Sequence, residues 1–110
     1  LKESKPEIYA QLENIYKTIE NLSKEYSEKG LTVGIMSTEE TKAKYTNKNT
    51  ISMGSRKNLK DIATNLFNIL RQFDKLEVDI ILAESVEESG IGKAIMNRMK
   101  KAAGGNIKEV

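Results

Sequence analysis

The sequence predicts a three-layer, Rossmann-like α/β domain with a small parallel sheet and helices on both faces. Short apolar, β-branched runs at residues 31–36, 50–53 and 78–84 alternate with longer amphipathic segments. Such alternation is typical of parallel strands joined by right-handed crossovers. The length of 110 residues corresponds to one domain, and 38% hydrophobic residues suffice for a modest core.

The first amphipathic segment covers residues 7–28. Its apolar side chains recur at spacings of four and three, which predicts one buried helix stripe: Ile8, Leu12, Ile15, Ile19, Leu22 and Tyr26. Gly30 follows, where a left-handed helix cap is expected. Residues 7–11 could instead be the end of a strand that enters the domain.

Residues 31–36 predict a buried strand. Ser37 and Glu40 then have capping-box spacing, which predicts a short helix to about Tyr45. A polar turn leads into the second strand, at residues 50–53, and Gly54 with Ser55 ends that strand.

The strongest helix pattern spans residues 58–74, and the strongest strand spans residues 78–84. Five of the seven residues in this strand are apolar, which favours a central strand buried on both faces. The last helix covers residues 91–103, and we expect one stripe of it to face the sheet: Ile91, Ile95, Met99 and Ala102. Residues 107–110 are either an edge strand or a tail.

Composition excludes several kinds of chemistry. The chain has no Cys and no His, so thiolate nucleophiles, disulfides and the commonest general base and metal ligands are absent. We predict no catalytic residue and no metal site. The net charge of +2 and the absence of a long apolar run predict no direct nucleic-acid binding and no membrane contact. The absence of Cys fits a reducing compartment, and we expect a cytoplasmic location. Because the chain begins at Leu1, we expect it to be part of a larger protein.

Two loops contain residues that could bind a phosphate at a helix start. Gly54, Ser55 and Arg56 lie between a predicted strand and helix, and Gly92 with Lys93 opens the last helix. Ordinary helix caps and turns account for both patterns more simply, and neither common nucleotide-binding fingerprint occurs.

The last third of the chain carries two further polar groups. Carboxylates at Glu84, Glu87 and Glu88 could bind Mg²⁺ or act as a base, although we favour a solvated acidic loop. Asn97 and Arg98 lie beside the apolar stripe of the last helix. We expect them to hold the domain or its partner in place, with Glu84 or Glu88 accepting from Arg98. The methionines at positions 53, 96 and 99 are interpreted as core residues.

Three segments together resemble a known family. Residues 78–84 end in Ala-Glu, and residues 90–105 contain a Gly-Ile-Gly turn followed by Met96-Asn97-Arg98 and Ala102-Ala103. Gly54-Ser55 and the helix after it fit the same pattern. Over about residues 30–107, the chain is similar to the C-terminal domain of Sua5-type threonylcarbamoyl-AMP synthases.

The resemblance implies a parent enzyme that uses ATP and Mg²⁺ to join L-threonine and bicarbonate into threonylcarbamoyl-AMP, for the t⁶A modification of tRNA. In the family the active site lies in an N-terminal catalytic domain, covered by a linker with a Lys/Arg-Tyr-x-His-Tyr-Ala-Pro motif. Neither is present here, and the linker motif cannot occur in this chain because the chain has no His. No cofactor is therefore expected in this fragment.

Residues 1–110 are accordingly interpreted as a single accessory domain, with residues 1–30 as the incoming segment and helix and residues 31–110 as the α/β core. Its expected partner is the N-terminal catalytic domain of the same protein, and alone it should be inactive. The alternatives are a stand-alone small-ligand or nucleotide-binding module, and a protein-interaction module.

Overall fold

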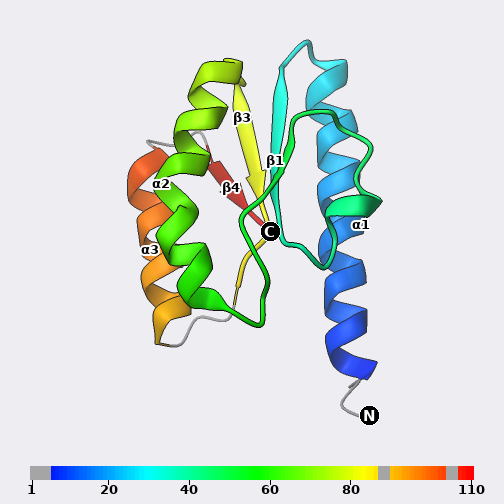
Figure 1. The fold of residues 1–110 in the computed structure, drawn as a ribbon. Coiled ribbons are helices and arrows are strands. Elements are labelled where there is room, and N and C mark those ends of the chain that lie inside the picture. The colour runs from blue at the N-terminus through cyan, green and yellow to red at the C-terminus, as the bar shows by residue number, and fades with distance from the viewer. Residues whose placement is uncertain (1–5, 87–89, 104–106) are drawn as a thin grey trace.

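The computed structural model describes residues 6–86, 90–103 and 107–110, and Figure 1 shows their arrangement. The elements in chain order are α1 (Pro6–Glu28), β1 (Val33–Ser37), the 3₁₀ turn η1 (Lys42–Lys44), β2 (Thr50–Ser52), α2 (Leu59–Leu76), β3 (Ile80–Ala83), α3 (Ile91–Ala103) and β4 (Ile107–Glu109). None of these helices is long and apolar enough to cross a membrane.

The four strands form one parallel sheet of order β2-β1-β3-β4. The strongest predicted strand, β3, is central as expected, and Met36 pairs with Ala83 across β1 and β3. The end of the chain, which the sequence left open between strand and tail, forms the edge strand β4 beside β3. The predicted three-layer parallel α/β fold is thus confirmed.

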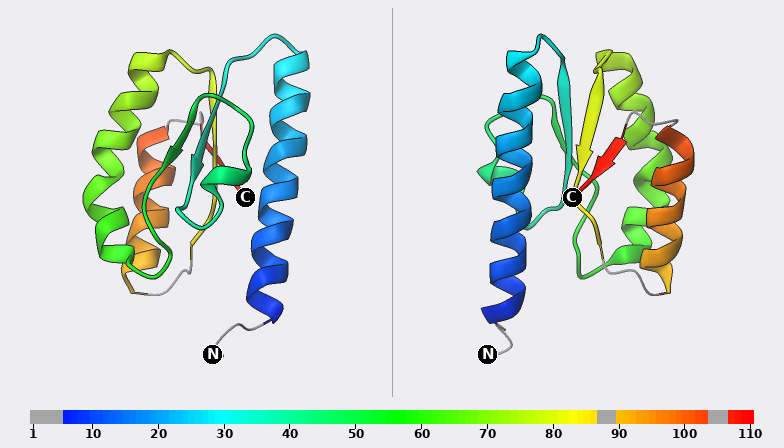
Figure 2. Two further views of the ribbon diagram at one scale, coloured as in Figure 1. Left: turned by 45° about the vertical axis from the view of Figure 1, so that its right-hand side comes forward. Right: turned by 180° about the vertical axis from the view of Figure 1, so that it is seen from behind.

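Helices cover both faces of the sheet (Figures 1 and 2). One face packs against α2 and α3 over a large apolar core built from alternate strand residues and the buried stripes of both helices. The other face packs against α1 over a smaller core, whose buried members are Ile19, Val33, Ile35, Tyr45 and Leu82.

α1 is helical from Pro6, which confirms the predicted helix and excludes its alternative, a strand end at residues 7–11. Pro suits the first helical turn because no N–H is needed there. Two other local predictions need correction. Ile95 and Met99 of the predicted α3 stripe are buried, whereas Ile91 is 43% exposed, and Gly92 and Met96 are buried as well. The sheet-facing stripe therefore coincides only in part with the predicted one.

The predicted helix from Ser37 to Tyr45 is also wrong. Ser37 is the last residue of β1, and only the 3₁₀ turn η1 is helical. The Glu39 N–H donates to the Gly54 carbonyl, 2.9 Å away, and Thr38 turns its side chain inward. These contacts tie the segment to the sheet edge, so the capping box cannot form.

Candidate site at the carboxyl edge of the sheet

The direction in which successive strands are added to the sheet reverses between β1 and β3. From β1 the chain moves to β2 on one side, and α2 then returns it to β3 on the other side. In open parallel sheets, ligands bind at this switch point, outside the carboxyl ends of the two strands. A ligand site in this fold is therefore expected at the residues that immediately follow β1 and β3.

A buried carboxylate lies at this position. Glu84 directly follows β3, and its N–H donates to the Met36 carbonyl at 3.0 Å, continuing the β1–β3 ladder. Its side chain is 0% exposed. Side chains alternate along a strand, so Glu84 projects to the α1 face, as Leu82 does.

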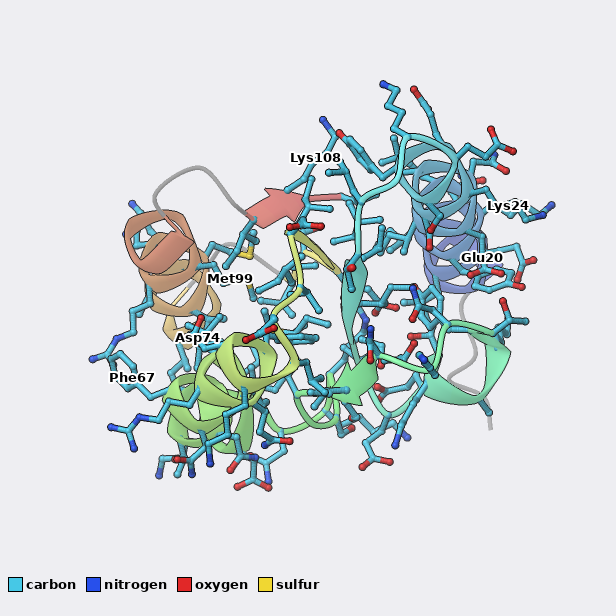
Figure 3. The ribbon with its side chains drawn as sticks, turned by 90° about the horizontal axis from the view of Figure 1, so that it is seen from above. Glu20, Lys24, Phe67, Asp74, Met99 and Lys108 are labelled. Carbon is cyan, nitrogen blue, oxygen red and sulfur yellow. The ribbon has the colours of Figure 1, made fainter. Side chains whose placement is uncertain are left out.

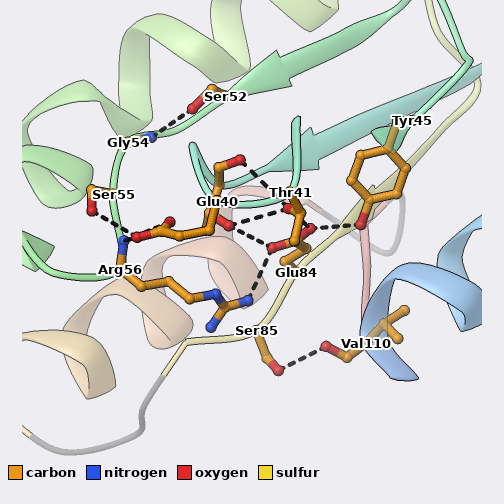
Figure 4. A network of polar contacts seen from close by, with 11 residues as sticks. Glu40, Thr41, Tyr45, Ser52, Gly54, Ser55, Arg56, Glu84, Ser85 and Val110 are labelled. Carbon is orange, nitrogen blue, oxygen red and sulfur yellow. Dashed lines mark hydrogen bonds and ion pairs between the residues drawn. The ribbon is translucent and has the colours of Figure 1, made fainter. Parts of the chain in front are cut away.

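Four side chains donate to the two oxygens of Glu84 (Figure 4). Oε1 accepts from the Thr38 hydroxyl at 2.9 Å and from Arg56 Nη2 at 3.0 Å. Oε2 accepts from the Tyr45 hydroxyl at 2.6 Å and from the Thr41 hydroxyl. A carboxylate has about four acceptor positions, so these contacts use them all. We call these five residues the Glu84 network.

The network joins three segments that are far apart in sequence. Thr38, Thr41 and Tyr45 come from the β1–β2 connection, the first two before η1 and Tyr45 after it. Arg56 comes from the loop before α2, and Glu84 directly follows β3. Arg56 is the cation that compensates the buried charge, with its own side chain 20% exposed. A buried carboxylate without such a partner would cost several kcal/mol.

Tyr45 acts as a permanent donor within the network. Burial raises the pKa of its hydroxyl, and the adjacent Glu84 carboxylate raises it further. Both effects disfavour a phenolate. The Tyr45 hydroxyl therefore stays protonated across the physiological pH range and donates a hydrogen bond to Glu84. Its ring also packs edge-on against Tyr16 of α1, with ring centroids 5.2 Å apart.

The loop of Gly54, Ser55 and Arg56, a candidate phosphate site in the sequence, already holds an anionic group. The carboxylate of Glu40 accepts from the Ser55 hydroxyl at 2.8 Å and from the Arg56 backbone N–H at 3.1 Å. Burial opposes ionisation of Glu40, but these two donors outweigh it and lower the pKa of the carboxyl. The donors that a phosphate would need are thus engaged by the chain itself.

Gly54 has a structural reason for its identity. Its φ is +128°, and a Cβ there would lie 3.1 Å from Ile62 Cγ1. Both the backbone conformation and the close approach of α2 favour glycine. Gly54 lets the chain turn sharply from β2 so that Arg56 reaches Glu84.

The second predicted phosphate loop lies apart from the network. Gly92 is buried in the first turn of α3, and Lys93 is exposed. None of the hydrogen bonds among the described residues joins either of them to the Glu84 network. Glu87 and Glu88, which the sequence grouped with Glu84, lie outside the described residues.

Arg98 does not pair with Glu84, because Arg56 takes that role. Arg98 is exposed and lies over the ring of Phe67, 5.1 Å from its centroid. Asn97 is exposed as well. The prediction that Arg98 bonds to Glu84 is therefore wrong. The prediction that Glu84 belongs to a solvated acidic loop is also wrong, because its side chain is fully buried.

The sequence contains a signal for this network that apolar periodicity does not reveal. Glu84 directly continues the most apolar strand, where a charged side chain has to be paired if it is buried. The polar residues Thr38, Thr41 and Tyr45 likewise follow a buried strand. Their partners could not be found by spacing, since Thr38 and Glu84 are 46 residues apart.

The described residues contain no group of three acidic residues placed to hold a metal ion. Glu84 has no free acceptor position for a metal or a substrate proton while its four donors remain in place. The fold and this closed edge together define a small doubly wound domain in which the usual ligand position is filled by the chain's own side chains.

Comparisons with known proteins agree with this class. The family profile described as "Threonylcarbamoyl-AMP synthase, C-terminal domain" matches residues 3–104. The chain therefore belongs to the family of threonylcarbamoyl-AMP synthase C-terminal domains. The resemblance seen in the sequence is confirmed.

Individual relatives are of the same kind. The chain is 44% identical to the threonylcarbamoyl-AMP synthase of Bacillus subtilis, covering 81% of this chain and 26% of that protein. It is 38% identical to the threonylcarbamoyl-AMP synthase of Pyrococcus abyssi, covering 89% of this chain and 27% of that protein. The chain thus spans about a quarter of the length of these relatives.

Two solved structures are similar. One is a double variant of Pyrococcus abyssi Sua5, with a TM-score of 0.74 and 38% identity, over 89% of this chain and 27% of that one. The other is a C-terminal Sua5 domain from a hypothetical Sua5 protein of Pyrococcus horikoshii, with a TM-score of 0.65 and 36% identity. The similarity to this second structure covers 89% of this chain and 87% of that domain.

Proposed function

We propose that this chain is an accessory domain of an enzyme that makes L-threonylcarbamoyladenylate from ATP, L-threonine and bicarbonate, for t⁶A modification of tRNA in the cytoplasm. The ATP and Mg²⁺ chemistry belongs to an N-terminal catalytic domain of the same protein, which is the domain's partner. The role of the accessory domain is to supply a rigid body that positions the linker and gates the neighbouring active site.

The filled switch point carries this proposal. A ligand-binding domain of this fold needs free donors or acceptors at the carboxyl edge. Here Glu84 is saturated, and Glu40 occupies the loop of Ser55 and Arg56. An edge of this kind is better suited to a rigid domain that positions its neighbours than to a domain that binds a substrate.

Pyrophosphate release from ATP tests the proposal. The purified chain should give no release that depends on threonine and bicarbonate, whereas the full-length Bacillus subtilis relative, assayed in parallel, serves as the positive control. Threonine-dependent release by the isolated chain would contradict the assignment of chemistry to another domain.

Calorimetry separates the accessory role from a stand-alone ligand-binding module. ATP, AMP and L-threonine are titrated into the wild-type chain and into Glu40→Gln, which weakens the hold on the Ser55–Arg56 loop. We expect no saturable heat with the wild type. Stoichiometric binding to the wild type would favour the small-ligand module, through the loop at Arg56 or through Gly92 and Lys93.

A further inference from the structure

The net charge of the chain conceals an uneven distribution between its two helical layers. α1 contains five glutamates and two lysines, a net charge of −3. α2 has three basic and two acidic residues, and α3 has four basic and none acidic, so this layer carries +5. The sheet separates the two layers (Figure 2). The α2–α3 layer therefore forms a basic face, whereas α1 is acidic.

The basic face also presents an exposed aromatic ring. Phe67 on α2 is 56% exposed, and the guanidinium of Arg98 from α3 covers it at 5.1 Å. Lys60, Phe67 and Arg71 are all exposed. Their spacings of seven and four place them along one side of α2. Figure 3 shows Phe67 on the outside of the α2–α3 layer, away from Lys24 on α1.

From this surface we infer that the α2–α3 face binds single-stranded RNA, in contrast to the expectation from the net charge alone that the chain binds no nucleic acid directly. Cations spaced along two neighbouring helices suit a phosphate backbone, and an exposed aromatic ring offers a stacking platform for a base. Exposed amides between the cations, at Asn68, Gln72 and Asn97, add hydrogen-bonding groups for base edges and sugars.

An acidic protein is the other polyanion that could fit, and the surface favours it less. A protein interface needs an apolar core, whereas the exposed large apolar side chains on these helices are few: Phe67, Leu76 and Ile91. The surface is instead made of cations and amides around one ring. This inference is independent of the proposed function, because it uses neither the carboxyl edge nor a catalytic domain.

Fluorescence anisotropy with a labelled single-stranded RNA of about 20 nucleotides tests the inference on the 110-residue chain. We expect a Kd of about 10⁻⁶–10⁻⁴ M, weakening steeply with salt, as counterion release requires. Phe67→Ala should weaken binding at least about fivefold, and Phe67→Tyr should restore it, since one stacked base contributes that much. Circular dichroism melts confirm that each variant is folded.

Charge reversals on opposite faces provide the matched pair. Arg71→Glu and Lys24→Glu change the net charge equally, but only the first lies on the basic face. We expect about a tenfold loss for Arg71→Glu and less than about a twofold loss for Lys24→Glu. Equal losses, no RNA binding at low salt, or tighter binding to a polyglutamate peptide of matched charge would each overturn the inference.

Discussion

The two faces of the sheet are stabilised in different ways. Against α2 and α3 the strands present an almost wholly apolar surface, and twelve buried residues among those with described side chains form its core. Against α1 the described part of the core has five buried members, and at its carboxyl end the apolar packing gives way to the Glu84 network. The same strands supply both faces through alternate side chains.

This difference indicates where each face is vulnerable. On the α2–α3 face the stabilisation is spread over many contacts, each of modest size. On the α1 face much of it depends on a few polar pairs, because a buried carboxylate is tolerated only while its donors stay in place. Substitutions in the network should therefore have larger effects than their small change in contact area suggests.

Removal of the cation should produce the largest loss. Arg56→Ala leaves the carboxylate of Glu84 buried without its counter-charge, and we expect about 3–5 kcal/mol of destabilisation. Urea unfolding followed by circular dichroism measures it. Lys57→Ala, at the next position and exposed, is the control and should cost no more than about 0.5 kcal/mol. Similar losses for the two variants would show that Glu84 does not depend on Arg56.

Loss of one hydroxyl tests the network at a second position. Tyr45→Phe removes a donor to Glu84 and keeps the ring, so we expect a loss of about 1.5–3 kcal/mol, the range for hydrogen bonds to charged groups. Tyr16→Phe is the matched control, since the Tyr16 hydroxyl makes none of the side-chain hydrogen bonds found among the described residues. If the two variants are equally stable, the bond to Glu84 contributes little.

A small added group tests the apolar face. A Cβ at Gly34 would lie 2.7 Å from the ring of Phe73, which is 1% exposed. Gly34→Ala should therefore cost about 1–3 kcal/mol by overpacking. In a Phe73→Leu background the same substitution should cost less, because the smaller side chain leaves room. Equal costs in both backgrounds would show that the strain arises elsewhere.

Acid titration should detect the contact between Glu40 and the loop before α2. Because the folded state lowers the pKa of Glu40 below its ordinary value of 4.5, the ionised carboxylate adds stability above that pH and loses it as the pH falls through the lowered pKa. Glu40→Gln should thus be less stable than wild type at pH 7, by no more than about 1 kcal/mol at this surface position. The difference should vanish in acid, and a constant difference would exclude ionisation as its cause.

The smallest effect is expected at Arg98. Its contact with the exposed ring of Phe67 is a surface cation–π pair, which contributes about 0.5–1 kcal/mol. Urea unfolding of Arg98→Ala measures it, and Arg98→Lys should retain part of the contribution. A loss above about 2 kcal/mol would point to a buried partner that this contact does not provide.

Much of the fold could be predicted from the sequence because its signals are local. Apolar periodicity placed the helices and the central strand, and the motif around Met96-Asn97-Arg98 indicated the family. The predicted Ser37 cap failed because a tertiary contact overrode it: Glu39 donates to the Gly54 carbonyl, and the segment is tied to the sheet edge.

The candidate site could not be predicted in the same way. Gly54, Ser55 and Arg56 were singled out as candidate ligand-binding residues, but the sequence could not show that Glu40 and Glu84 would occupy donors of Ser55 and Arg56. Such pairings depend on strand order and register, which bring residue 84 beside residue 38. The calorimetric titrations test whether these residues bind a ligand.

A double-mutant cycle between Arg56 and Glu84 tests most directly whether the switch point is held closed from within. Unfolding free energies are measured for wild type, Arg56→Ala, Glu84→Ala and the double variant. The account predicts that the double variant loses far less than the sum of the two single losses, with an interaction energy of about 1.5–3 kcal/mol. Additive losses, within about 0.5 kcal/mol, would show that the two residues do not stabilise each other and would contradict the account.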